Sequence, residues 1–226
     1  MLALVLVAAF GIAAETVPAC DRGAPQPLGF HSRGFGYVAE VFPPKSRHNR
    51  GSRPVAYLYE VGYPGSEWRV QARRLWTAAL PHELMPQAAL VSMAGQLVTL
   101  DDHHQAGAGP ALVIYDLGGR LVRSFTLVQL LEPSDLARVT VSDCGRLWRE
   151  RARFFFTSTG DAKLFVLLHW GRVLELRLAT GELKRGLIAS FPALRDIAAR
   201  RFPNEETEVW MLSLRFSSLS DFVPPR

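Results

Sequence analysis

The sequence predicts a mainly β fold built of antiparallel, blade-like sheets, and three observations predict it. Short apolar runs rich in Val, Leu, Phe and Tyr recur along the chain with Gly turns between them. These runs repeat in one order: strand, tight turn, strand, loop, strand, polar turn, strand. In addition, 48% of the 226 residues are hydrophobic and 21% are charged, which excludes a disordered chain, a collagen-like fibre and a multi-pass membrane protein.

Residues 1–14 are an apolar run with no ionisable side chain. As a helix this run would be about 21 Å long at roughly 1.5 Å per residue, which is shorter than the ~30 Å hydrocarbon core of a membrane. Small residues follow at cleavage positions, so we predict a signal peptide over residues 1–19 and an exported, periplasmic or extracellular protein. The run lacks a basic region before its apolar core, and the alternative is a buried first element of the fold.

The chain contains two cysteines, Cys20 and Cys144. In an exported protein such a pair can form one disulfide that closes a long loop and stabilises the fold. Residues 17–20 also resemble a bacterial lipobox, in which the Cys after the cleavage point is acylated, so a membrane tether is expected only if Cys20 is acylated. The remaining alternative is two unpaired, buried thiols.

After the signal peptide, the elements follow in order. Residues 20–35 are rich in Gly and Pro and are expected to form an irregular lead-in. A single β-repeat domain is predicted over residues 36–226. Its expected strands end at Gly, Pro or polar turns and cover residues 37–42, 55–61, 68–72, 88–92, 96–100, 111–116, 120–127, 153–157, 162–168, 173–178 and 183–188. Residues 127–138 predict a short helical insert around a Pro, and residues 192–201 predict a C-terminal helix with Leu194, Ile197 and Ala198 on one face.

The strands group into blade-like units near residues 36–80, 88–126 and 153–188. Ser92–Val98 resembles the S-x-D-G turn of WD40-like, YVTN-type and quinoprotein-like β-propeller repeats, with Ala94 in place of the Asp. Val113–Leu121 and Leu176–Leu183 resemble the strand and Gly turn that follow in such repeats. The chain is also similar to uncharacterised exported bacterial proteins built of such blades. The resemblance implies a partial or open β-propeller-like array, because three units are fewer than a closed propeller needs.

Asp101, Asp102, His103 and His104 follow a predicted strand and are the candidate metal ligands, because imidazole and carboxylate bind zinc and other first-row metals. Adjacent residues on an extended chain point to opposite faces, so a further ligand must come from elsewhere. The possible donors are His82, Glu83 and His169. One alternative is therefore a metal-dependent hydrolase-like enzyme that uses Asp101, His103 and His104. The other is a polar loop on the surface whose carboxylates cap backbone amides.

Lys45, Arg47, Arg50 and Arg53 form a basic stretch flanked by Pro. Their charges could bind phosphates or anionic lipid headgroups. The stretch holds no aromatic residue for base stacking, and a net charge of +5 does not by itself indicate a nucleic-acid partner. We therefore expect no specific nucleic-acid binding, and the alternative is a solvated loop whose charges protect a sheet edge.

Motifs for other chemistry are missing from the sequence. It contains no G-x-S-x-G nucleophile elbow and no phosphate-binding loop, so no catalytic residue and no organic cofactor is assigned. Enzyme activity stays open. The sequence favours a non-catalytic binding or protein-interaction module in the bacterial envelope, whose partner is an unknown protein or small ligand.

Overall fold

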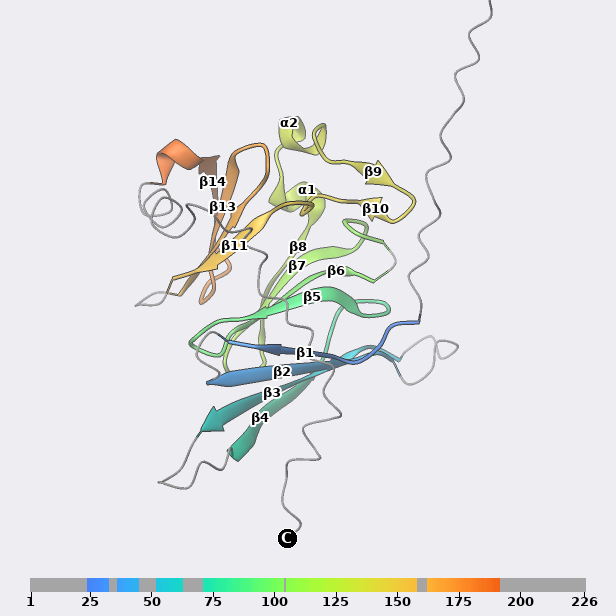
Figure 1. The fold of residues 1–226 in the computed structure, drawn as a ribbon, viewed down its shortest axis with the longest axis vertical. Coiled ribbons are helices and arrows are strands. Elements are labelled where there is room, and N and C mark those ends of the chain that lie inside the picture. The colour runs from blue at the N-terminus through green and yellow to red at the C-terminus, as the bar shows by residue number, and fades with distance from the viewer. Residues whose placement is uncertain are drawn as a thin grey trace, which may run out of the picture.

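The computed structural model describes residues 24–32, 36–44, 52–62, 71–103, 105–157 and 162–191. The fold of these residues is mainly β, as predicted. Three four-stranded antiparallel sheets follow one another along the chain, and each takes its strands in sequence order. We call them blades 1, 2 and 3; Figure 1 shows them in blue to teal, in green, and in yellow to orange.

The strands have the following bounds. Blade 1 contains β1 (Leu28–His31), β2 (Tyr37–Phe42), β3 (Val55–Gly62) and β4 (Gln71–Ala79). Blade 2 contains β5 (Pro86–Val91), β6 (Leu97–Asp102), β7 (Pro110–Tyr115) and β8 (Leu121–Thr126). Blade 3 contains β11 (Arg153–Phe156), β12 (Lys163–Leu167), β13 (Arg172–Arg177) and β14 (Leu183–Leu187), and a 3-10 turn, η1 (Ile188–Ser190), follows it.

A linker joins blades 2 and 3. It carries two helical turns, α1 (Leu127–Leu130) and α2 (Pro133–Leu136), which match the predicted helical insert. A short hairpin of β9 (Val141–Ser142) and β10 (Gly145–Arg146), which the sequence did not predict, follows α2. No helix among the described residues is long and apolar enough to cross a membrane.

Two sequence expectations about blade 1 are wrong. The lead-in over residues 20–35 is not irregular throughout, because β1 pairs with β2 as the first strand of the blade. The strand expected to end at residue 72 continues further: β4 runs to Ala79 and pairs with β3, with a bulge between Leu58 and Tyr59 of β3. The signal peptide and the helix expected over residues 192–201 lie outside the described residues, and both stay predictions.

Blade 2 is buried on both faces. All six residues of β6 are buried, and all but the first of β7 are. Successive side chains alternate between the two sides, as the period of a strand requires. Leu97 and Val113 pack in a cluster with blade 1, whereas Val98 and Ile114 pack in a cluster with blade 3.

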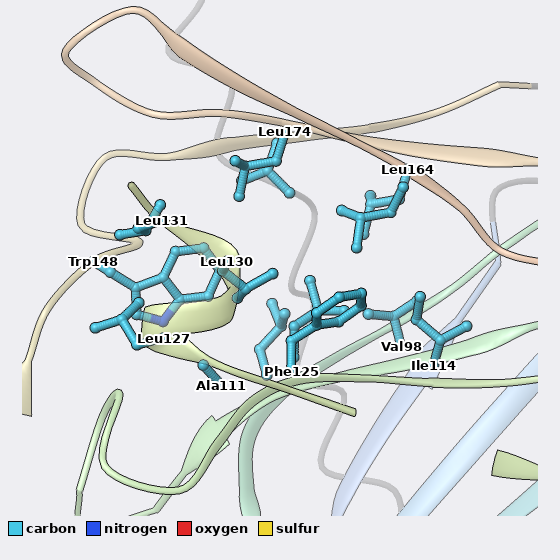
Figure 2. Packing of buried hydrophobic residues seen from close by; sticks show 14 of the residues in the cluster. Val98, Ala111, Ile114, Phe125, Leu127, Leu130, Leu131, Trp148, Leu164 and Leu174 are labelled. Carbon is cyan, nitrogen blue, oxygen red and sulfur yellow. The ribbon is translucent and has the colours of Figure 1, made fainter. Parts of the chain in front are cut away.

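The core between blades 2 and 3 is the larger of these clusters. Leu164 and Leu174 of blade 3 face Ile114 and Phe125 of blade 2, and Trp148 closes one end of the cluster from the linker (Figure 2). Each of these five side chains is at most 4% exposed. Burial of apolar area at this joint and at the joint with blade 1 therefore fixes the order of the blades.

Two turn glycines bring blades 2 and 3 into close contact with the outer strand of the preceding blade. Gly119 lies in the β7–β8 turn with φ +79°, and a Cβ there would lie 2.6 Å from the ring of Trp76 on β4. Gly181 lies in the β13–β14 turn with φ +69°, and a Cβ there would lie 2.5 Å from the Cβ of Arg123 on β8. Only Gly combines this backbone conformation with so close an approach.

Candidate functional site

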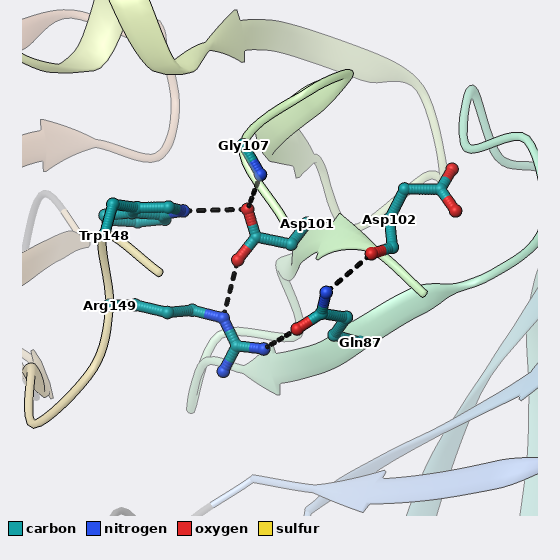
Figure 3. Close-up of polar contacts among 6 residues, drawn as sticks. All are labelled: Gln87, Asp101, Asp102, Gly107, Trp148 and Arg149. Atoms are coloured by element: carbon teal, nitrogen blue, oxygen red, sulfur yellow. Dashed lines mark hydrogen bonds and ion pairs between the residues drawn. The ribbon is translucent and has the colours of Figure 1, made fainter. Parts of the chain in front are cut away.

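Asp101, at the end of β6, is the centre of a buried polar network (Figure 3). Its Oδ1 accepts hydrogen bonds from Trp148 Nε1 at 2.7 Å and from the Gly107 amide at 3.0 Å, and its Oδ2 accepts one from Arg149 Nε at 2.7 Å. Asp101 is fully buried and has φ +52°, a left-handed conformation that Asp tolerates better than most residues. Burial raises the pKa of this carboxyl, and the charge of Arg149 and the three donors oppose that rise.

The network continues to Asp102 through Gln87. Arg149 Nη2 donates to Gln87 Oε1, and Gln87 Nε2 donates to the carbonyl oxygen of Asp102, each at 2.6 Å. The Asp102 carboxylate accepts the Glu83 amide at 2.6 Å. The two carboxylates therefore diverge: Asp101 binds the linker after blade 2, and Asp102 binds the linker before it.

The predicted metal ligands do not form a cluster among the described residues, where no group of three or more His, Cys, Asp or Glu side chains is placed to hold an ion. His104 lies outside those residues. Of the possible further donors, Glu83 lies beside Asp102, whereas His169 Nδ1 contacts the carbonyl oxygen of Glu150 at 3.2 Å. The metal site stays a prediction. Both carboxylates accept backbone amides, as the alternative expects, but its surface placement is wrong, because Asp101 and Asp102 are buried.

His82 lies in the linker between β4 and β5 and is fully buried. Among the residues that the structure describes, neither of its ring nitrogens has a hydrogen-bond partner. Burial lowers its pKa to about 4, and the nearby charge of Asp102 opposes this only in part. His82 is therefore neutral near pH 7, and the fold must accommodate an additional charge when it is protonated.

A second buried carboxylate repeats the pattern seen at Asp101. Asp135 of α2 is 3% exposed, accepts a hydrogen bond from Trp170 Nε1 at 3.0 Å and pairs with Arg172 Nε at 2.8 Å. Trp170 and Arg172 belong to the β12–β13 hairpin of blade 3. The linker is thus held to blade 2 through Asp101 and to blade 3 through Asp135, in each case by one Trp and one Arg.

A groove of about 490 Å³ lies at the outer rim between blades 2 and 3. It is formed by β8, α1, the β13–β14 turn and β14, and its lining residues are Arg123, Phe125, Gln129, Thr180, Gly181, Glu182, Leu183 and Arg185. We call this the rim groove. The sequence did not single out these side chains, because nothing in their spacing brings β8 and the distant turn together.

Within the rim groove, hydrogen-bond donors dominate. The Arg123 guanidinium lies 5.6 Å from the centroid of the Phe125 ring and forms no ion pair among the described residues. Arg185 donates to the carbonyl oxygens of Leu130, at 2.9 Å, and Gln129, which fixes it against the end of α1. The acidic lining residue, Glu182, pairs with Arg177 at 2.9 Å.

The remaining predicted sites lie mostly outside the described residues. Of the basic stretch, only Arg53 is described, and it is exposed; Lys45, Arg47 and Arg50 are not among the described residues. Cys20 lies outside the described residues. The anion site and the pairing of Cys20 with Cys144 therefore stay predictions.

Comparison with known proteins identifies no relative by sequence. No family model and no curated protein matches the chain. Among solved structures, the chain is similar to one titled "Crystal structure of HIRA(644-1017)", at 12% sequence identity and a TM-score of 0.35, with 75% of this chain and 55% of that chain covered. The chain thus spans about half the length of that structure. At that TM-score the similarity carries no argument about fold or function.

The buried role of Asp101 predicts the effect of Asp101→Asn. This change removes the negative charge that pairs with Arg149 while it keeps the side chain's shape, so we expect the free energy of unfolding to fall by about 3 kcal/mol in urea denaturation. The matched control is Glu60→Gln, which breaks the exposed Arg73–Glu60 pair and should cost less than about 1 kcal/mol.

Chelation separates the two interpretations of Asp101. If its role is to accept hydrogen bonds, EDTA leaves the unfolding free energy of the wild-type protein unchanged. If Asp101 binds a metal with His103 and His104, EDTA lowers the wild-type value to that of Asp101→Asn, and the purified protein carries a stoichiometric ion.

The buried His82 predicts a loss of stability in acid. Its pKa is about 4 in the folded protein and about 6.5 in the unfolded chain, so its contribution to stability is complete above pH 6.5 and is lost as the pH falls towards 4. The total loss corresponds to about 3 kcal/mol. In His82→Leu we expect this part of the pH dependence to disappear from urea denaturation curves, and an equally steep loss in the variant would contradict the assignment.

Proposed function

We propose that this chain is an exported protein-interaction module that acts by binding rather than by chemistry of its own. The observation that carries the proposal is the rim groove, where residues of two blades and one linker meet around hydrogen-bond donors that the fold leaves available. Concave sites with a few convergent polar groups at the joint of two units are typical binding sites.

The walls of the rim groove are fixed before any partner binds. The β8 wall belongs to blade 2, whose Phe125 is buried in the core shared with blade 3. The opposite wall is the β13–β14 turn, which Gly181 holds against Arg123. The end of α1 is held by Arg185. Preorganised side chains lose little conformational entropy on binding, which favours affinity for a partner.

Cross-linking at the rim groove tests the proposal. A photoreactive amino acid in place of Thr180, in cells that make the protein, should give one discrete adduct with a partner. The matched control is Thr140, an exposed threonine that does not line the groove, and the same substitution there should not give that adduct. Identical adducts from both positions, or none from Thr180, would reject an interaction role for the groove.

Export is the second part of the proposal, and the apolar run of residues 1–14 with the small residues after it supports it. We expect the mature protein to begin near Cys20. Intact mass before and after reduction checks this, since a Cys20–Cys144 disulfide makes the unreduced chain lighter by two hydrogens and acylation of Cys20 makes it heavier by the acyl chain. A mass that retains residues 1–19 would contradict export by this route.

A further inference from the structure

We infer that the rim groove recognises an acidic peptide segment of its partner, with an Asp or Glu carboxylate bound to the Arg123 guanidinium. This inference rests on the proposed interaction role and names its ligand class. Three properties of the groove lead to it: the donors that line it, the balance of its charges, and the small apolar area beside Arg123.

The lining offers donors and few free acceptors. Gln129 Oε1 is used by the Thr126 amide at 2.9 Å, so its Nε2 group is available to donate. Thr180 Oγ1 accepts the Glu182 amide at 3.3 Å, which leaves its hydroxyl hydrogen available. Arg185 binds carbonyl oxygens through Nε and Nη2, and no bond of the described residues uses its Nη1. Such a surface is complementary to a ligand rich in acceptors.

The charges of the rim groove favour an anion with one negative charge. Arg123 and Arg185 contribute two positive charges and Glu182 contributes one negative charge, so the lining side chains carry a net charge of +1. A guanidinium binds a carboxylate through two parallel hydrogen bonds. A doubly charged phosphate would bring a second negative charge close to Glu182, so a carboxylate fits the balance better.

The apolar part of the lining favours a peptide over a nucleic acid. Phe125 is 4% exposed and Arg123 lies over its ring, so the ring offers no free face on which a base could stack. Leu183 is half-buried and lies in the same lining. Leu183 can therefore contact the methylene groups of an acidic side chain, while its carboxylate reaches the donors.

An NMR titration of the ¹⁵N-labelled protein tests the inference with defined probes. We expect an acetylated, amidated hexaglutamate peptide to shift the amide signals of Thr180, Gly181 and Glu182 in a saturable manner, and the corresponding hexaglutamine peptide to leave them in place. Arg123→Gln should weaken hexaglutamate binding about tenfold or more, because it removes a charge-assisted hydrogen bond. Arg138→Gln makes the same change at an exposed position outside the groove and should leave the affinity unchanged.

Each other outcome overturns the inference. An equal loss of affinity in both variants would indicate diffuse attraction to positive charge, and full affinity in Arg123→Gln would exclude Arg123 as the carboxylate ligand. Shifts with inorganic phosphate but not with hexaglutamate would identify a phosphate site instead. If Thr180 cross-links a partner but hexaglutamate does not bind, the interaction role stands and the acidic ligand is wrong; if Thr180 gives no adduct, the interaction role itself fails.

Discussion

Burial of blade 2 on both faces is the constraint on which the rest of the structure depends. A single twisted sheet of four strands cannot bury either of its faces by itself, so each blade needs a neighbour. Blade 2 has two, and its inner strands β6 and β7 carry apolar side chains towards both. Beyond blade 3, Phe191 packs edge-on against Phe165 and covers part of that blade's other face. Because successive apolar side chains of β6 and β7 point to opposite faces, blade 2 packs against one neighbouring blade on each face.

The polar residues that most suggested chemistry act at the joints of this array. Asp101 binds Trp148 and Arg149 of the following linker, and Asp102 binds the Glu83 amide of the preceding one. Asp135 then repeats the Trp and Arg arrangement against blade 3. A buried carboxylate without such partners would be strongly unfavourable. The hydrogen bonds and ion pairs of these three carboxylates therefore favour one arrangement of the blades more strongly than apolar packing alone would.

The sequence predicted the blades well because strand period and Gly turns are local signals. Every strand predicted between residues 88 and 188 has an observed counterpart, and the Gly119 and Gly181 turns occupy the same place in successive blades. β1 was missed because its four residues lie in a Gly- and Pro-rich segment and become a strand through pairing with β2. The end of β4 was placed too early because the exposed, charged Arg73 and Arg74 interrupt its apolar pattern. The partners of Asp101 and the lining of the rim groove depend on contacts between distant segments, which no local pattern contains.

The Gly turn between the last two strands of a blade lies at a closed joint in blade 2 and at an open groove in blade 3. At the joint of blades 1 and 2, Gly119 approaches Trp76, a side chain that is 8% exposed and packs beside Tyr115, so aromatic surface fills the space. At the joint of blades 2 and 3, Gly181 approaches the stem of Arg123 instead. Burying a guanidinium that has no carboxylate partner is costly, so it cannot be packed away as an indole ring can. One Arg on the outer strand of blade 2 therefore leaves a charged, open rim where the equivalent contact of blade 1 is apolar and closed, and this difference places the candidate binding site at the second joint.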